Sequence, residues 1–179
     1  MKEKIKKIKL IVLDVDGVLT DAGLMLGHDG FEYMKFNVQD GAGIVLARKL
    51  GYQFAIITGR DTQIITTRAT QLGIHDVYLK KINKIPAFED LLKKKKLKTE
   101  EVCYMGDDIL DIPLLKRAGL AVVPANGNAE TKKFADIITQ RSGGDGAVRE
   151  LIDLILDEMG FKEKLISDIE KGLEIGVSV

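Results

Sequence analysis

The stretch IKLIVLDVDGVLTD, residues 8–21, decides the fold. It joins an apolar run, rich in β-branched residues, to two aspartates and a glycine. Side chains alternate along a strand, so Asp14 and Asp16 project toward the same space where the strand ends and the chain turns at Gly17. A run that is apolar throughout is typical of a parallel strand buried on both faces. The stretch therefore predicts a buried strand with two carboxylates at its carboxyl end.

Further along the chain, short apolar runs alternate with amphipathic helical patterns. This alternation is typical of βα units and a parallel sheet. Strands are expected at residues 8–15, 53–58, 76–79, 102–105, 120–123 and near 137. Helices are expected at residues 42–50, 62–72, 84–95, 109–118, 129–134 and 147–159. The fold class is therefore α/β, a doubly wound, Rossmann-like parallel sheet.

One segment departs from this alternation. Residues 23–36, GLMLGHDGFEYMKF, contain two short strand patterns around a His-Asp-Gly turn and predict a β-hairpin. A hairpin inserted after the first strand would overhang the carboxyl edge of the sheet, where α/β proteins bind ligands. We expect one domain at residues 1–160 without a separate cap domain, followed by a C-terminal tail at 161–179 that is amphipathic at first and ends in GLEIGVSV.

Composition excludes several classes of partner. The 27 basic residues balance the 27 acidic ones, so there is no global field to attract nucleic acid. No apolar stretch approaches the roughly 20 residues that span a bilayer. The single Cys103 cannot form an internal disulfide and lies in an apolar run, as expected for a buried thiol in a reducing compartment. We expect a cytoplasmic protein that acts on a small molecule, with no nucleic-acid or membrane partner.

The acidic residues point to a metal. Burying Asp14 beside Asp16 is unfavourable unless a cation or a proton is shared. A second cluster, GDDILD at 106–111, follows another apolar strand and supplies Asp107, Asp108 and Asp111. Together these oxygen ligands suit Mg²⁺ and argue against zinc.

Two further motifs lie between the acidic clusters. In ITGR, residues 57–60, the Thr58 hydroxyl and the Gly59 backbone amide can donate to phosphoryl oxygens. Lys84, at the start of a predicted helix, can neutralise both a phosphate and the surrounding carboxylates. Each signal is weak alone. Their order along the chain, with each one at the carboxyl end of a separate strand, predicts a single site at one sheet edge.

This order of motifs resembles the haloacid dehalogenase superfamily over about residues 8–150. The resemblance implies that Asp14 attacks phosphorus and forms an aspartyl phosphate. It also implies that Asp16 protonates the leaving alcohol and then activates water. Thr58 and Lys84 would grip the phosphoryl group.

The same resemblance implies a set of ligands for Mg²⁺. They would be Asp14, the backbone carbonyl of Asp16 and Asp107, with Asp108 or Asp111 assisting through water.

Spacing and local motifs narrow the resemblance. About 40 residues separate the first two motifs, which fits the capless subclass. DVDGVLTD, FNVQDGAGI, ITGR, GDDILD and GGDGAVRE, together with Arg68, resemble the 3-deoxy-D-manno-octulosonate 8-phosphate phosphatase family. That resemblance implies a phosphorylated sugar acid as substrate, a step in lipopolysaccharide precursor synthesis. It also implies a homotetramer in which hairpins associate and a neighbour's tail helps cover the site.

Several residues could bind the sugar acid. Arg60 and Arg68 offer a planar fork that suits a carboxylate. Asp40 and Gly41 follow the hairpin, and Gly144 lies in a glycine-rich loop that could approach the substrate through its backbone.

Two alternatives stay open at this point. An arginine directly after Thr-Gly, as at Arg60, resembles the octulosonate enzymes. A glutamate at this position resembles the nonulosonate 9-phosphate branch. A signalling receiver domain also combines aspartates, Thr and Lys with Mg²⁺ on a parallel sheet. Receivers carry the phosphorylated Asp on the third strand, whereas the third strand expected here, at residues 76–79, ends without an acid.

Overall fold

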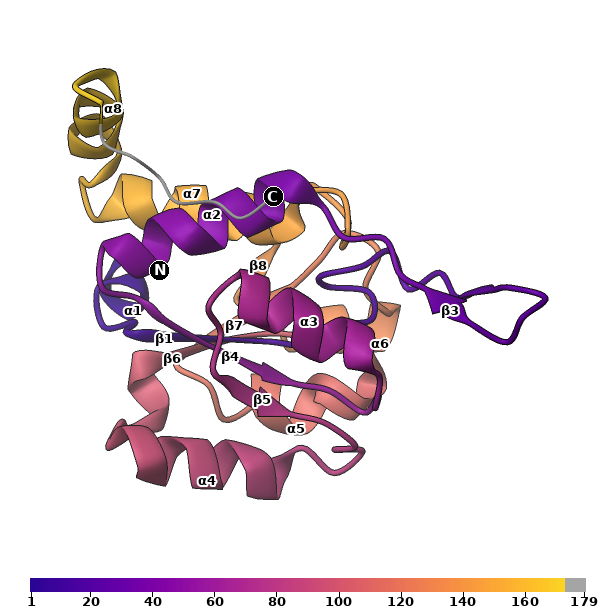
Figure 1. Cartoon of the computed structure of the whole chain (residues 1–179). Coiled ribbons are helices and arrows are strands. Elements are labelled where there is room, and N and C mark those ends of the chain that lie inside the picture. Colours follow the sequence, from indigo (N-terminus) through magenta and orange to yellow (C-terminus); the bar gives the residue numbers. More distant parts are fainter. Residues whose placement is uncertain (173–179) are drawn as a thin grey trace.

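In the computed structural model, which describes residues 1–172, six parallel strands form one sheet in the order β5-β4-β1-β6-β7-β8 (Figure 1). The strands are β1 (Leu10–Leu13), β4 (Gln53–Ile57), β5 (Asp76–Tyr78), β6 (Val102–Met105), β7 (Leu120–Val123) and β8 (Ile137–Ile138). β1 lies between β4 and β6 and pairs in parallel with both. The predicted parallel α/β sheet is confirmed, and β1, which Asp14 directly follows, lies at its centre.

Helices cover both faces of the sheet. On one face lie α2 (Val38–Lys49), α3 (Gln63–Gln71) and α7 (Ala147–Glu158), and on the other α4 (Ile85–Lys95) and α5 (Ile112–Leu115) (Figure 1). Ile11 and Leu13 of β1 pack toward the first group, and Leu10 and Val12 toward the second. The continuous apolar run in β1 therefore reflects burial on both sides.

Shorter elements complete the description. They are α1 (Lys2–Ile5), α6 (Ala129–Lys132), α8 (Lys162–Glu170) and two 3₁₀ turns, Thr99–Glu101 and Ile109–Asp111. The helix expected at 109–118 is divided into the second 3₁₀ turn and α5. Pro113 is the reason, because it lacks a backbone N–H and favours the first turn of a helix.

Helix α2 begins earlier than its sequence pattern predicts. The Asn37 side chain accepts hydrogen bonds from the backbone amides of Gln39 (2.7 Å) and Asp40 (3.3 Å) and so caps the helix at residue 38 instead of 42. Asp40 and Gly41 are consequently part of the first helical turn. The sequence pattern placed them after the hairpin and before the helix expected from residue 42.

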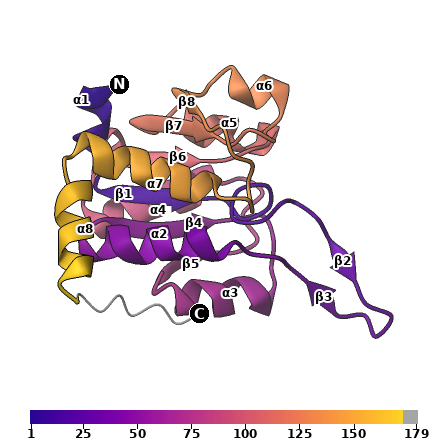
Figure 2. The same cartoon turned by 90° about the horizontal axis from the view of Figure 1, so that it is seen from above.

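The predicted hairpin is present as β2 (Met25–Leu26) and β3 (Glu32–Tyr33), an antiparallel pair. It extends away from the domain, beyond the end of the sheet (Figures 1 and 2). Its large apolar side chains are exposed, with Phe31 at 66%. We call this set the hairpin patch: Leu24, Met25, Leu26, Phe31 and Tyr33.

The glycine-rich segment GGDGAVRE packs against the turn that follows β1. A Cβ on Gly143 would lie 1.9 Å from the Gly17 carbonyl oxygen, so only glycine permits this approach. Asn126 joins the two segments, because its side chain donates to that carbonyl (3.1 Å) and accepts from the Gly143 amide (2.7 Å). These contacts fix the backbone next to Asp16.

The last described residues extend α8 to Glu170 and the chain to residue 172. Most of the predicted GLEIGVSV tail lies outside the described residues, and the expectation that it covers a neighbour's site remains a prediction. Within residues 1–172, no helix has both the length and the apolar character needed to span a bilayer.

Candidate active site

A cavity of about 350 Å³ opens at the carboxyl edge of the sheet, at the ends of β1, β4 and β6. It brings together most of the residues expected from sequence. These are Asp14, Asp16, Thr58, Gly59, Arg60, Lys84, Asp107, Asp108 and Asp111. Ala22, Lys81, Ile82 and Leu110 complete the lining. Parallel strands place their carboxyl ends at one edge, so motifs distant in sequence meet there.

Lys84 is the cation at the centre of the cavity. It immediately precedes α4, its Nζ lies 2.7 Å from Asp14 Oδ2 and 2.6 Å from Asp111 Oδ1, and the residue is only 4% exposed. A buried ammonium is retained only with such partners. These carboxylates raise the pKa of Lys84 even though its burial lowers it, so it stays charged.

Three carboxylates crowd around this one cation. Oxygens of Asp14, Asp107 and Asp111 lie within 4.8 Å of one another. Burial and the neighbouring Asp111 carboxylate raise the pKa of Asp14 to about 7, against the effect of Lys84. Burial, with the charges of Asp14 and Asp111, raises the pKa of Asp107 to about 7 as well. Such an excess of negative charge fits a divalent cation, which favours the ionised form of its ligands.

The three acids of GDDILD differ in what their oxygens contact. Asp111 is fully buried and accepts from Lys84, from Tyr104 and from the backbone amides of Asp107 (2.9 Å) and Asp108 (3.1 Å). Asp108 is exposed and caps the Ile109 amide. Within residues 1–172, no such set of donors reaches the Asp107 carboxylate, and a Cβ on Gly17 would lie 2.0 Å from its Oδ2. Asp107, with Asp14, is therefore the better candidate for direct contact with Mg²⁺.

Asp16 is more accessible than Asp14. Arg60 reaches it from β4, with Nε 3.7 Å from Asp16 Oδ2, while its Nη2 lies 2.7 Å from Glu32 Oε2. Burial raises the pKa of Asp16, and the Arg60 charge opposes the shift. A raised pKa favours the protonated form that a general acid needs.

Thr58 and Gly59 line the cavity at the end of β4. Thr58 is buried, and its hydroxyl accepts from the Arg60 amide at 3.2 Å. A hydroxyl that accepts one bond keeps its own proton to donate. The pair is therefore placed where it can donate to an anion in the cavity.

Four predicted substrate residues do not line this cavity. Asp40 is 1% exposed, and its Oδ1 accepts from the Arg149 amide (2.7 Å) in the first turn of α7. Arg68 lies against Gly41 and donates to Gln71. Gly144 has φ +66° and packs on the turn after β1, where its amide donates to Val18. Their predicted contact with substrate remains a prediction.

Sequence reasoning missed two residues that touch the site residues. Glu32, on β3, holds Arg60, and Tyr104, on β6, holds Asp111 and Lys84. Neither belongs to a motif. The Glu32–Arg60 and Tyr104–Lys84 contacts span 28 and 20 positions of chain, whereas the Tyr104–Asp111 contact spans 7. The apolar pattern around Tyr104 predicted a buried strand but not which polar groups its hydroxyl would contact.

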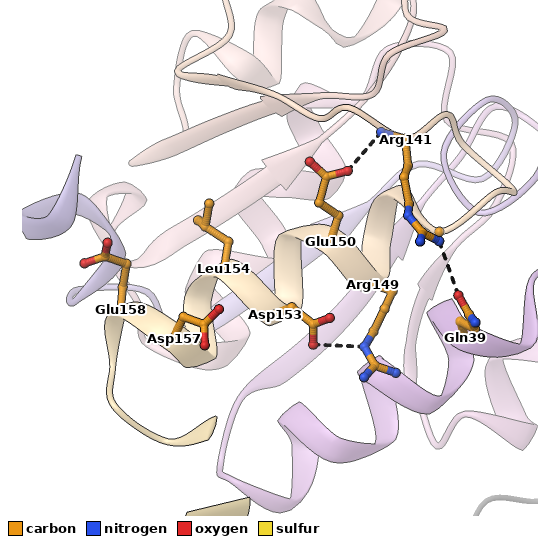
Figure 3. Close-up of a pocket in the computed structure, with 9 residues that line it drawn as sticks. Gln39, Arg141, Arg149, Glu150, Asp153, Leu154, Asp157 and Glu158 are labelled. Atoms are coloured by element: carbon orange, nitrogen blue, oxygen red, sulfur yellow. Dashed lines mark hydrogen bonds and ion pairs between the residues drawn. The ribbon is translucent and has the colours of Figure 1, made fainter. Parts of the chain in front are cut away.

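A second cavity, of about 580 Å³, lies on the α7 side of the molecule (Figure 3). Several of its polar groups are hydrogen-bonded to one another. Arg141 donates to Gln39, its backbone amide donates to Glu150, and Arg149 donates to Asp153 (Figure 3). None of the predicted site residues lines it, so the sheet edge is the better candidate.

The chain belongs to the haloacid dehalogenase-like hydrolases, whose family model matches residues 62–151. More narrowly, it is similar to 3-deoxy-D-manno-octulosonate 8-phosphate phosphatases. It is 43% identical over 157 residues to the enzyme KdsC of Escherichia coli K12, covering 88% of this chain and 84% of the relative.

Solved structures agree with this similarity. A probable YrbI family phosphatase from Pseudomonas syringae superposes with a TM-score of 0.92 at 40% identity, over 96% of this chain and 97% of the other. The Moraxella catarrhalis octulosonate phosphatase, solved with magnesium, phosphate and KDO, gives 0.89 at 36% identity, over 93% and 96%. The predicted family and fold class are confirmed.

The carboxylate cluster predicts how stability depends on pH and Mg²⁺. Because the folded-state pKa values of Asp14 and Asp107 are raised from 3.8 to about 7, metal-free protein should lose stability as pH rises through that window. Mg²⁺ at about 100 times its Kd should stabilise the fold at pH 8 by about 2.7 kcal/mol. Thermal unfolding with and without Mg²⁺ measures both effects.

Two variants test whether the Mg²⁺ response depends on the carboxylate cluster or on any aspartate at this edge of the sheet. Asp107→Asn should lose most of the Mg²⁺-dependent stabilisation. Asp61→Asn, at the same edge but paired with Lys80, should keep it. An undiminished Mg²⁺ response in Asp107→Asn would contradict the assignment of Asp107 to the metal.

Proposed function

We propose that this protein is a Mg²⁺-dependent phosphatase that hydrolyses 3-deoxy-D-manno-octulosonate 8-phosphate to the free sugar acid and phosphate, a step in lipopolysaccharide precursor synthesis. One observation carries the proposal. In a chain 43% identical to enzymes named for that reaction, Asp14, Lys84 and Asp107 meet in one cavity. The Moraxella catarrhalis structure, which holds magnesium, phosphate and KDO, supports the same substrate and ion.

The arrangement suits a two-step reaction on phosphorus. A carboxylate oxygen of Asp14 forms a bond to phosphorus as the bond to the sugar oxygen breaks, and Asp16 gives its proton to that oxygen. Asp16 then takes a proton from water, which attacks phosphorus and releases Asp14 and phosphate. Lys84 and Thr58 hold phosphoryl oxygens throughout.

The residues present fit Mg²⁺ held by Asp14, Asp107 and the backbone carbonyl of Asp16. Bound there, the ion would supply positive charge to the phosphoryl oxygens. It would also keep Asp14 ionised in a setting that otherwise raises its pKa.

The covalent step predicts that Asp14 is indispensable. Asp14→Asn should lower kcat by about a thousandfold or more, because an amide is a poor nucleophile for phosphorus. Asp21→Asn, at an exposed aspartate of the same loop, should stay near the wild-type rate. Phosphate release under saturating Mg²⁺ gives both values.

A single turnover in heavy-oxygen water gives a sharper result. Hydrolysis of an aspartyl phosphate by attack on phosphorus places the heavy oxygen in phosphate, and the peptide containing Asp14 stays unlabelled. In a separate experiment the phosphoryl group of the substrate carries the label. Rapid quenching should then trap that phosphoryl label transiently on the peptide that contains Asp14. Direct attack by water, with no labelled peptide at any time, would contradict a covalent intermediate.

Recognition of the sugar acid is assigned to Arg60. Its guanidinium is a quarter exposed and is held between Asp16 and Glu32, at the open side of the cavity. Donors of its fork that these contacts leave unused could pair with the substrate carboxylate. The sugar's acid group thus fits this position better than a neutral hydroxyl would.

Arg60→Ala should raise KM for octulosonate 8-phosphate by about tenfold or more, the value of one charged hydrogen bond. KM for mannose 6-phosphate, which lacks a carboxylate, should change far less. Arg117→Ala, whose guanidinium donates to Pro113 away from the cavity, is the matched control. Equal effects on both substrates would remove Arg60 from carboxylate recognition, and a wild-type preference for nonulosonate 9-phosphates would replace the proposed substrate.

We also propose a homotetramer that associates through the hairpin patch. An isolated two-stranded hairpin with a largely exposed apolar surface gains stability when that surface is covered. Association there would add a cover beside an otherwise open cavity.

The single Cys103, buried in β6, is compatible with the expected cytoplasmic location.

The hairpin patch makes the oligomer testable. Light scattering should give about four times the chain mass for wild type and a smaller assembly for Phe31→Asp, because a charge would be buried in the contact. Ile138→Asp, at a half-exposed residue of the edge strand β8, should leave the mass unchanged. A wild-type monomer would refute the tetramer, and an unaltered assembly in Phe31→Asp would place its interface elsewhere.

A further inference from the structure

Tyr104 does not line the cavity itself, but its side chain contacts two residues that do, Lys84 and Asp111. It belongs to β6, is fully buried, and pairs in register with Val12 of β1. Its hydroxyl donates to Asp111 Oδ1 at 2.6 Å and accepts from Lys84 Nζ at 3.3 Å. The only polar atom of this side chain is therefore directed at two residues of the site.

Lys84 gains a fixed orientation from this contact. An ammonium group has three donors. Here Nζ has three acceptors within hydrogen-bond distance, namely Asp14 (2.7 Å), Asp111 (2.6 Å) and the Tyr104 hydroxyl. The lysine side chain is otherwise long and flexible, so a third anchor restricts where its charge lies.

Tyr104 also completes the set of hydrogen-bond donors around the Asp111 carboxylate. A carboxylate offers about four acceptor positions. Those of Asp111 are occupied by Lys84, Tyr104 and the backbone amides of Asp107 and Asp108. Burial and the charge of Asp111 raise the pKa of Tyr104 well above its ordinary value, so the phenol keeps its proton and donates.

We propose that Tyr104 is a positioning residue for phosphoryl transfer, which holds Lys84 and Asp111 so that the ammonium stands against Asp14 before substrate arrives. The inference rests on the proposed phosphatase activity. Phenylalanine would fill the same space between the sheet and α5, and a buried hydroxyl is costly unless it is bonded. The hydroxyl therefore serves the polar network, and packing alone does not require it.

Tyr104→Phe tests the role with little change of volume. We expect kcat to fall by about tenfold, because the ammonium that stabilises the transition state is less well placed. KM for octulosonate 8-phosphate should change by less than about threefold, because Arg60 is untouched. Tyr78→Phe is the matched control, since that strand tyrosine also donates to an aspartate, Asp90, at 2.7 Å but outside the cavity.

The assay is repeated with p-nitrophenyl phosphate, a generic phosphomonoester. Lys84 acts on the phosphoryl group, so kcat should fall by a similar factor for both substrates. Wild-type kcat in Tyr104→Phe with either substrate overturns the positioning role alone. A wild-type enzyme that hydrolyses the generic ester but not octulosonate 8-phosphate overturns the proposed substrate alone, and one that hydrolyses neither overturns both proposals.

A double-mutant cycle distinguishes positioning from a general structural effect. If Tyr104 acts through Asp111 and Lys84, adding Tyr104→Phe to Asp111→Asn should lower kcat by no more than about twofold further. Multiplicative losses in the double variant would show that the hydroxyl acts independently of Asp111 and would overturn the part of the proposal that concerns Asp111. Thermal unfolding of each variant, expected to stay close to its parent, excludes loss of fold as the cause.

Discussion

Three carboxylates, two of them buried, lie around one buried ammonium in this protein, and the polar groups near the site compensate for the excess of negative charge. Lys84 contacts Asp14 and Asp111, while Asp107 lies close by and forms no ion pair with any residue of 1–172. Charges placed together in a low-dielectric setting are unfavourable unless opposite charges or donors surround them. The surrounding backbone amides and Tyr104 supply donors, and the remaining deficit of positive charge fits a divalent ion. A site built this way is ready to receive an anionic phosphoryl group only when its cations are in place.

The open side of the cavity is organised differently. Arg60 lies between the acid/base candidate Asp16 and Glu32 of the hairpin. One guanidinium, proposed to bind the substrate carboxylate, therefore contacts both the catalytic aspartate and the projecting strands. The hairpin therefore contacts the site directly, because Glu32 accepts a hydrogen bond from the Arg60 guanidinium. The buried floor of the site is thus set by the core, whereas its rim depends on an element that extends away from the core (Figure 2).

Much of the fold was predictable because its signals are local. Apolar runs gave all six strands of the sheet, and the positions of the acidic motifs after them gave one site at their carboxyl ends. Element boundaries were less predictable. Asn37 starts α2 about a turn early by capping it, so Asp40 belongs to the first helical turn, where it is a buried acceptor for the Arg149 amide.

By itself, the sequence determined the parallel sheet, the family and the set of acids, Thr58 and Lys84 that meet at one edge, because the positions of strands and helices and the chemistry of the motifs are written in short contiguous segments. Only the tertiary structure decided which of those acids is already saturated with donors and which is left for a cation. It also decided that Tyr104 and Glu32 belong to the site. The physical reason is that hydrogen-bond saturation and burial depend on neighbours brought together by folding, which no local pattern of residues encodes.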